Sequence, residues 1–88
     1  MSATGDTIAA IQAFIQQLQQ AATAAKAAIS QAEQGRAKAT GVGDARSITT
    51  FTQVHQLLSE AHRSVGATIG QAERAMTWTK AMQDGGGP

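Results

Sequence analysis

The two histidines are the first residues whose chemistry could matter. His55 and His62 are seven residues apart, which on a straight helix is two turns, or about 10.5 Å. Because a metal ion bonds an imidazole nitrogen at about 2.0–2.1 Å, the two side chains cannot share one ion. We expect two polar histidines on a partly solvated face. The alternative is pH-sensitive assembly, if both histidines reach a seam between hairpins.

The six carboxylates are scattered, and their spacing places no two of them on one helical turn. General acid–base catalysis needs groups that are positioned together and tuned by their surroundings. The chain also has no cysteine, which excludes disulfides and thiolate metal sites. We therefore expect no catalytic residue, no cofactor and no metal, and we predict that the protein is not an enzyme.

Three cations gather near the middle of the chain, at Arg36, Lys38 and Arg46, with Asp44 opposing them. No aromatic residue is interleaved among them, so stacking on nucleic-acid bases is not supported. The Gly-Lys-Ser/Thr end of a phosphate-binding loop is also absent. With a net charge of only +1, we expect no nucleic-acid partner.

These residues must be positioned by helices, because apolar residues recur in steps of three and four. In the first half of the chain the steps run without a fault from Ile8 to Ala32, which is a heptad seam. Alanine and glutamine fill the positions between, and both are good helix formers. The pattern predicts a helix over about 6–34 that ends at Gly35 or, at the latest, by Gly41.

A connection is expected over about 35–47, where three glycines permit a chain reversal. Asp44 or Ser47 can cap the helix that follows. That helix is predicted over about 48–83, with a flexible glycine-rich tail at 85–88. Two successive steps of four shift its seam toward an eleven-residue repeat. The predicted seam comprises Phe51, Val54, Leu58, Ala61, Val65, Ile69, Ala72, Met76 and Thr79.

Two helices of similar length joined by one loop predict an all-α fold, an antiparallel two-helix hairpin forming a single domain over 1–84. The apolar content exceeds one stripe per helix, since Phe14, Leu57 and Trp78 flank the seams and alanine surrounds the first helix. A helix that is apolar on several sides is buried on several sides. We therefore expect assembly into a four-helix bundle or a larger helical oligomer.

Gly66 and Gly70 lie one turn apart inside the second helix, where each costs about 1 kcal/mol relative to alanine. They indicate either a groove that a helix or extended peptide approaches closely, or two tolerated weak points. Trp78 is either a core residue or an anchor for a partner. The residues expected at an oligomer or partner interface are Ile8, Ile11, Phe14, Ile15, Leu18, Ala22, Ala25, Ile29, Phe51, Val54, Leu58, Val65, Gly66, Ile69, Gly70, Met76 and Trp78.

No run of 18 apolar residues occurs, so no membrane span is predicted. The first residues lack a basic segment followed by an apolar one, so we expect no Sec-type signal peptide. The expected location is the cytoplasm, or outside the cell by a route that needs no signal peptide.

The chain as a whole has a Met-Ser start, no cysteine, an Ala/Gln-rich first helix, a glycine-containing turn at mid-chain and a glycine-rich tail. This pattern resembles the small actinobacterial helical-hairpin proteins of the WXG-motif family of type VII secretion substrates. The resemblance implies hairpins paired in four-helix bundles, as homodimers or heterodimers, that act as effectors, adaptors or chaperone-like partners. The turn reads Gly41-Val42-Gly43 where the family has Trp-X-Gly, and Met82 stands where its export signal has an acidic residue. No motif residue is therefore carried over.

The sequence thus predicts a non-enzymatic protein–protein interaction module whose partner is itself or a related helical hairpin, with a link to type VII secretion. The alternative is a self-assembling structural or scaffold protein of the cytoplasm. A third hypothesis is an enzyme or ligand carrier whose pocket appears only in an oligomer.

Overall fold

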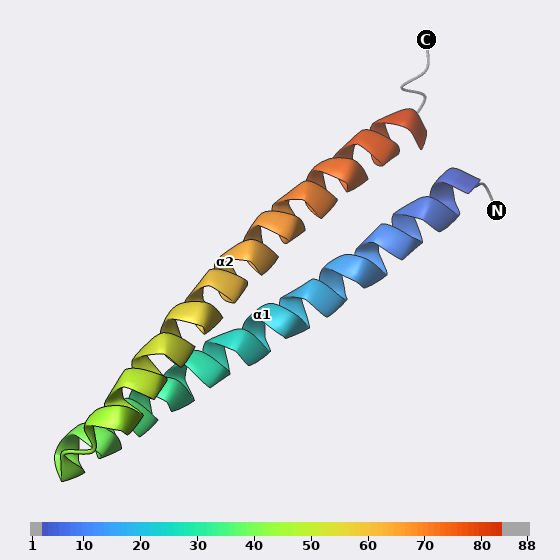
Figure 1. The fold of residues 1–88 in the computed structure, drawn as a ribbon. Coiled ribbons are helices and arrows are strands. Elements are labelled where there is room, and N and C mark those ends of the chain that lie inside the picture. Colours follow the sequence, from blue (N-terminus) through green and yellow to red (C-terminus); the bar gives the residue numbers. More distant parts are fainter. Residues whose placement is uncertain (1–2, 84–88) are drawn as a thin grey trace.

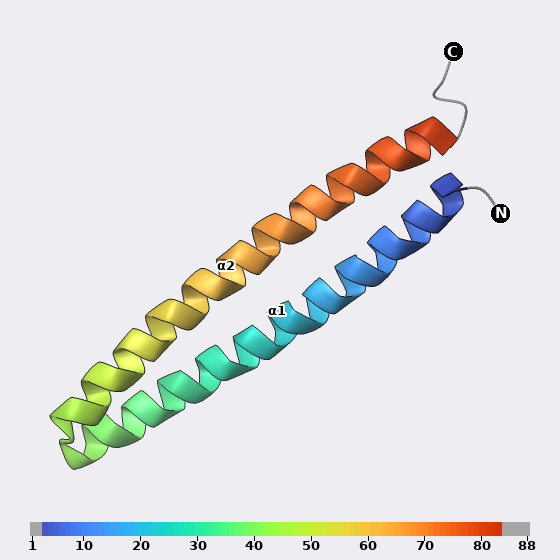
Figure 2. The same ribbon diagram turned by 45° about the vertical axis from the view of Figure 1, so that its right-hand side comes forward.

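The computed structural model describes residues 3–83, and in that range the chain forms two long helices and no strand. Helix α1 (Ala3–Val42) and helix α2 (Ala45–Ala81) run antiparallel, with both outer ends at the same end of the molecule (Figure 1). The view turned by 45° shows the same side-by-side arrangement (Figure 2). The predicted all-α antiparallel hairpin is confirmed.

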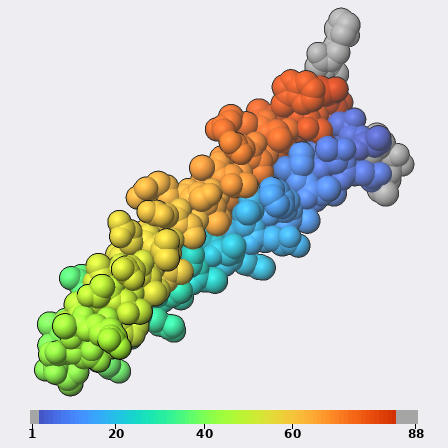
Figure 3. Space-filling view, viewed as in Figure 1, coloured from blue at the N-terminus to red at the C-terminus, as the bar shows by residue number. Residues whose placement is uncertain are grey.

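The hairpin is a rod rather than a globule. Its extents are 67 × 19 × 12 Å and its radius of gyration is 19.6 Å, whereas a compact domain of this length has a radius of gyration of about 12 Å. In the space-filling view the two helices remain in contact along the rod (Figure 3). No third element covers either broad side of the helix pair within residues 3–83.

The turn between the helices is much shorter than the predicted loop. Gly43 adopts a left-handed backbone with φ of +73°, which favours glycine. Its N–H donates to the Thr40 carbonyl at 3.2 Å, and the N–H of Asp44 donates to the Ala39 carbonyl at 3.0 Å. These two bonds form a Schellman motif, which satisfies the last carbonyls of α1 and reverses the chain at once.

Asp44 ends this motif and also caps α2, so the structure selects it from the two candidate caps, Asp44 and Ser47. Its carboxylate accepts hydrogen bonds from the Ser47 backbone N–H at 3.1 Å and from the Ser47 hydroxyl at 2.7 Å. The Ser47 side chain and then its backbone hold the pKa of the Asp44 carboxyl below its ordinary value. The carboxylate therefore stays ionised at neutral pH, where its charge also suits the positive end of the α2 dipole.

The predicted helix ends at the turn were wrong. α1 does not end near residue 34 but continues through Gly35 and Gly41, and α2 begins at Ala45, so 35–47 is not a loop. The predicted tail at 85–88 lies outside the described residues. A glycine breaks a helix only where a left-handed conformation is adopted, and here the Schellman bonds place that conformation at Gly43.

The seam of α1 is the predicted one. Within residues 3–83 the buried apolar residues are Ile8, Ile15, Ala32, Ala39 and Ala72, and none is completely buried. The other seam residues of α1, from Ile11 to Ile29, are half-buried. This shallow burial is what two helices produce, because each covers only one stripe of the other.

The seam of α2 differs from the prediction at two places. Val54 and Ala61 are exposed, and the half-buried positions one residue further along are His55 and His62. With the histidines included, the steps from Ile48 to the end of the helix alternate three and four throughout. The predicted drift toward an eleven-residue repeat was therefore wrong, and both helices keep a seven-residue repeat.

Gly35 owes its place in α1 to a close contact with α2. A methyl group added there would lie 2.5 Å from Cε1 and 2.6 Å from Cζ of Phe51. No real side-chain carbon approaches an aromatic ring so closely, so the missing side chain of Gly35 makes room for the Phe51 ring. The glycine that resembled a helix stop is a packing position.

Threonine hydroxyls form hydrogen bonds to backbone carbonyls of their own helix. Nine threonines, including Thr7, Thr68 and Thr79, donate to the carbonyl four residues earlier at 2.8–3.1 Å. A hydroxyl bonded in this way needs no water or partner. A threonine bonded in this way can therefore lie under a docked partner without leaving its hydroxyl unpaired.

We predict that Gly43→Ala destabilises the hairpin by about 1–2 kcal/mol, because an L side chain is strained in a left-handed conformation. Gly41→Ala is the matched control: Gly41 is helical, nothing lies within 4 Å of an added methyl group, and alanine favours a helix by about 1 kcal/mol. Urea unfolding followed by circular dichroism measures both. Equal effects of the two substitutions would contradict the assigned turn.

We also predict opposite outcomes for two interior glycines. Gly66→Ala should raise the free energy of unfolding by about 1 kcal/mol through helix propensity, since nothing lies within 4 Å of the added methyl group. Gly35→Ala should lose that gain and lower the unfolding midpoint, because the Phe51 ring must move out of the seam. Thermal unfolding of the two variants and the parent measures both midpoints. A higher midpoint for Gly35→Ala than for the parent would disprove the Phe51 contact.

Candidate interaction surface

Large apolar side chains stay exposed although the seam is formed. Trp78 is 68% exposed, Leu57 66% and Phe14 48%, and Val54 and Met82 are also exposed. Isolated apolar residues on a surface need no explanation, but a contiguous group of them marks an interaction site. Whether these residues form such a group depends on their positions around the two helices.

The heptad register places all five on one side of the hairpin. With the seam at positions a and d, each exposed apolar residue falls at position g or c. Two contacts between the helices involve positions beside the seam. Gly35, at position g, faces Phe51, and Glu33, at position e, bonds His55. In an antiparallel pair the g positions of both helices flank the same side of the seam, and the e positions flank the other side.

We call the part of the g and c side formed by residues 10–31 of α1 and 54–82 of α2 the uncharged face. It comprises Ala10, Phe14, Gln17, Ala21, Ala24, Ala28 and Gln31 of α1 and Val54, Leu57, Ala61, Ser64, Thr68, Gln71, Ala75, Trp78 and Met82 of α2. None of these residues is charged, and the nearest cation on this side is Lys38, beside the turn. Even the hydroxyl of Thr68 donates internally, to the Ser64 carbonyl at 2.9 Å.

The opposite broad side, at positions e and b, is the polar face. It carries Lys26 and Glu33 of α1 and Arg63, Glu73 and Lys80 of α2, all of them exposed. Mixed charges with glutamine and threonine between them suit contact with water. The hairpin is therefore amphipathic as a whole, in addition to the amphipathic pattern of each helix.

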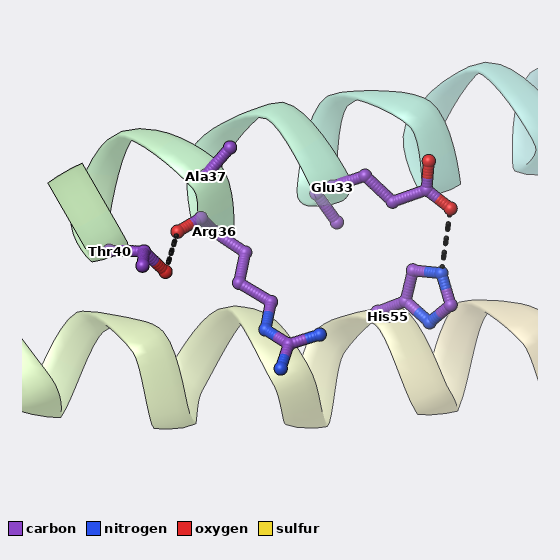
Figure 4. Close-up of a pocket in the computed structure, with 6 residues that line it drawn as sticks. Glu33, Arg36, Ala37, Thr40 and His55 are labelled. Atoms are coloured by element: carbon purple, nitrogen blue, oxygen red, sulfur yellow. Dashed lines mark hydrogen bonds and ion pairs between the residues drawn. The ribbon is translucent and has the colours of Figure 1, made fainter.

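A shallow groove on the polar face is the other candidate site (Figure 4). It is lined by Ala32, Glu33, Arg36, Ala37, Thr40 and His55. Within residues 3–83 its Glu33–His55 pair is the one ion pair, with Oε1 and Nε2 3.0 Å apart. The Thr40 hydroxyl donates to the Arg36 carbonyl at 2.8 Å, so it is not poised as a nucleophile.

The chemistry that this groove can support is limited by its openness. The side chains of His55 and Glu33 are 39% and 62% exposed, and an ion pair at such a site contributes about 0–1 kcal/mol. No group of three His, Cys, Asp or Glu residues that could hold a metal occurs within residues 3–83. Of the two candidates, the uncharged face is the more extensive and the more distinctive.

The predicted interface residues divide into the seam and the outer surface. Phe14, Val54, Gly66 and Trp78 are exposed. Gly70 is half-buried on the polar face. The rest are buried or half-buried in the seam: Ile8, Ile11, Ile15, Leu18, Ala22, Ala25, Ile29, Phe51, Leu58, Val65, Ile69 and Met76. The seam joins the two helices of one chain, and most of its residues keep part of their surface exposed.

The predicted interface set lacked several residues of the uncharged face. Leu57 and Met82 were not in it, nor were the alanines at 28, 61 and 75. A signal for them was present, because a seam that includes His55 and His62 assigns every flank residue to one side. When residues are assigned to the seam by apolarity alone, Val54 is chosen over His55 and the correct register is missed.

Gly66 and Gly70 lie on the polar face, away from the exposed apolar residues. A methyl group added at Gly66 meets nothing within 4 Å, and one at Gly70 meets only Arg74, at 3.7 Å. Shallow grooves lie around His55 and along the outer side of α1 near Gln20, away from both glycines. The isolated hairpin therefore favours the interpretation of the two glycines as tolerated weak points.

Comparisons with protein-family models, with curated proteins and with solved structures found no match. Within the described part of the chain, neither helix combines the length and apolarity needed to cross a membrane. The functional argument therefore depends on the surface of the hairpin itself.

We predict that leucine at either histidine stabilises the hairpin. A fully buried leucine contributes about 1.5–3 kcal/mol, and a half-buried one about half of that. The ion pair lost in His55→Leu contributes about 0–1 kcal/mol. His62→Leu should raise the unfolding midpoint more than His55→Leu, because it loses no ion pair. The residue of α1 beside His62, one heptad before Glu33, is Lys26. A lower midpoint for His62→Leu than for the parent would contradict the seam assignment.

Proposed function

We propose that the protein is a non-enzymatic interaction module: a helical hairpin that docks its uncharged face onto another helical hairpin. The observation that carries the proposal is the confinement of Phe14, Val54, Leu57, Trp78 and Met82 to one broad side, on which the nearest charge is Lys38 beside the turn. Aromatic and methionine side chains are enriched in the cores of protein interfaces, and charged ones are depleted.

Exposed area supports the same proposal. The chain exposes 6289 Å², whereas a compact monomer of its 9.0 kDa mass exposes about 4,900 Å². The excess is of the order of one interface side, since a stable complex buries about 800 Å² on each partner. A docked hairpin would cover this excess and build the core that two helices cannot enclose.

The proposal includes the link to the WXG-motif family that the sequence resembles. The supporting features are coarse: a hairpin of two long helices with its turn at mid-chain, and an apolar side for a second hairpin. Export by a route without a signal peptide is part of that link. The groove at His55 and Glu33 supports no competing function as strongly, because it is open and holds no positioned nucleophile.

Thermal unfolding across a wide dilution series tests the docking function. We expect the dilute single hairpin to melt at low temperature and with weak cooperativity, because docking stabilises the native state by mass action. Circular dichroism follows helix content, and fluorescence of Trp78, the single tryptophan, follows burial of the uncharged face. A dilute single molecule that melts sharply at high temperature would overturn the proposal.

A further inference from the structure

We propose that the groove on the polar face is a second docking surface, where Arg36 anchors a carboxylate carried by an acidic segment of a protein partner. The groove lies beside the turn and is lined by residues of both helices (Figure 4). The uncharged face lies on the opposite broad side, so both surfaces can be occupied at once. This inference goes beyond the docking of another hairpin on the uncharged face and does not depend on it.

Arg36 stands at a seam position, one heptad after Ile29, although the seam of α1 is apolar from Ile8 to Ala32. Its side chain is exposed. Because successive residues of a helix are about 100° apart around the axis, position a lies next to position e, on the polar side. Figure 4 shows the guanidinium of Arg36 reaching from α1 towards α2 at the groove. The charged head therefore stays in contact with water at the edge of the seam.

No carboxylate in the described part of the chain pairs with Arg36. The stretch of α2 nearest the turn, 45–59, includes no acid. On α1 the side chain of Glu33 points away from Arg36 and bonds His55, with Oε1 and Nε2 3.0 Å apart. The carboxylate of Asp44, at the turn, already accepts two hydrogen bonds at the start of α2. The N–H donors of the guanidinium are therefore free for an acceptor from outside the chain.

Positive charge is concentrated in the half of the hairpin that contains the groove. Residues 26–63 carry five Lys or Arg and three Asp or Glu, whereas the rest of the described chain carries two of each kind. Two of those three acids, Glu33 and Asp44, already accept hydrogen bonds. An excess of one sign of charge attracts partners of the opposite sign and speeds their association. The charge of this half therefore fits an acidic partner.

A carboxylate fits the groove better than a phosphate does. A guanidinium pairs with either group through two parallel hydrogen bonds. Glu33, however, places a negative charge in the same groove, and it opposes a doubly charged phosphate more than a singly charged carboxylate. The methyl groups of Ala32 and Ala37 also line the groove and suit contact with the methylenes of a glutamate side chain.

The openness of the groove favours a carboxylate on a protein over a free small molecule. The groove has a volume of about 550 Å³, but the side chains of Glu33 and His55 in it are 62% and 39% exposed. Small-molecule sites bury about 70–90% of the ligand surface, which such a groove cannot do. An acidic side chain of a protein partner is held in place by the rest of that partner's contacts, and arginine is one of the residues that anchor such interfaces.

Nuclear magnetic resonance titration of the full chain tests the site. The probe is an alanine-rich peptide with regularly spaced glutamates, and its control is the same peptide with glutamine at those positions. We expect chemical-shift changes at Arg36, Ala37, Thr40 and His55 with the glutamate peptide only, and weaker binding at higher salt. No change at millimolar peptide, changes centred on the uncharged face, or equal changes with the glutamine peptide would overturn the proposal.

Two arginine variants separate a specific anchor from a general effect of charge. Arg36→Gln should raise the dissociation constant of the glutamate peptide about tenfold. Arg74→Gln is the matched control, because it removes the same charge from an exposed position in the other half of the hairpin. Glutamine is a good helix former at both positions, and circular dichroism checks that both variants fold. Equal weakening by the two variants, or tighter binding of inorganic phosphate or a DNA oligonucleotide than of the peptide, would overturn the proposal.

Discussion

Everything in this structure follows from the limit that two helices place on burial. Each helix can cover only one stripe of the other, so the core is a seam along a rod 67 Å long. Isoleucines and leucines that a globular domain would bury completely remain partly exposed. The apolar residues beside the seam have no cover within residues 3–83, which is why the molecule has one uncharged and one polar broad side.

The seam also explains why histidine is tolerated at its centre. His55 and His62 occupy positions that belong to apolar residues in a closed bundle, yet they remain half-exposed and His55 reaches Glu33. A polar ring at such a site loses little hydration, whereas the same ring in a dry core would need a buried partner. Histidine is therefore tolerated in the seam because the seam stays partly exposed to water.

The turn shows how few residues are needed to make the hairpin. Gly43 supplies the left-handed conformation, and Asp44 both completes the bonds that end α1 and begins those of α2. Because the reversal takes only two residues between the helix ends, the register of α1 against α2 is set at the turn. That register then brings Gly35 to Phe51 and Glu33 to His55.

The amino-acid sequence by itself determined the two helices, the seam of α1 and the excess of apolar surface, because these depend on local propensity and on periodicity. It left the cap of α2 open between Asp44 and Ser47. It could not determine where α1 ends or which residues of α2 enter the seam. Gly35 carries the same local signal whether it stops a helix or receives a ring, and Val54 is more apolar than His55. Only the packing of α2 on α1 decides those cases, since it alone shows which side of each residue another helix occupies. The tertiary structure likewise decided that the exposed apolar residues share one uncharged face, because the two flanks become one surface only when the helices lie antiparallel.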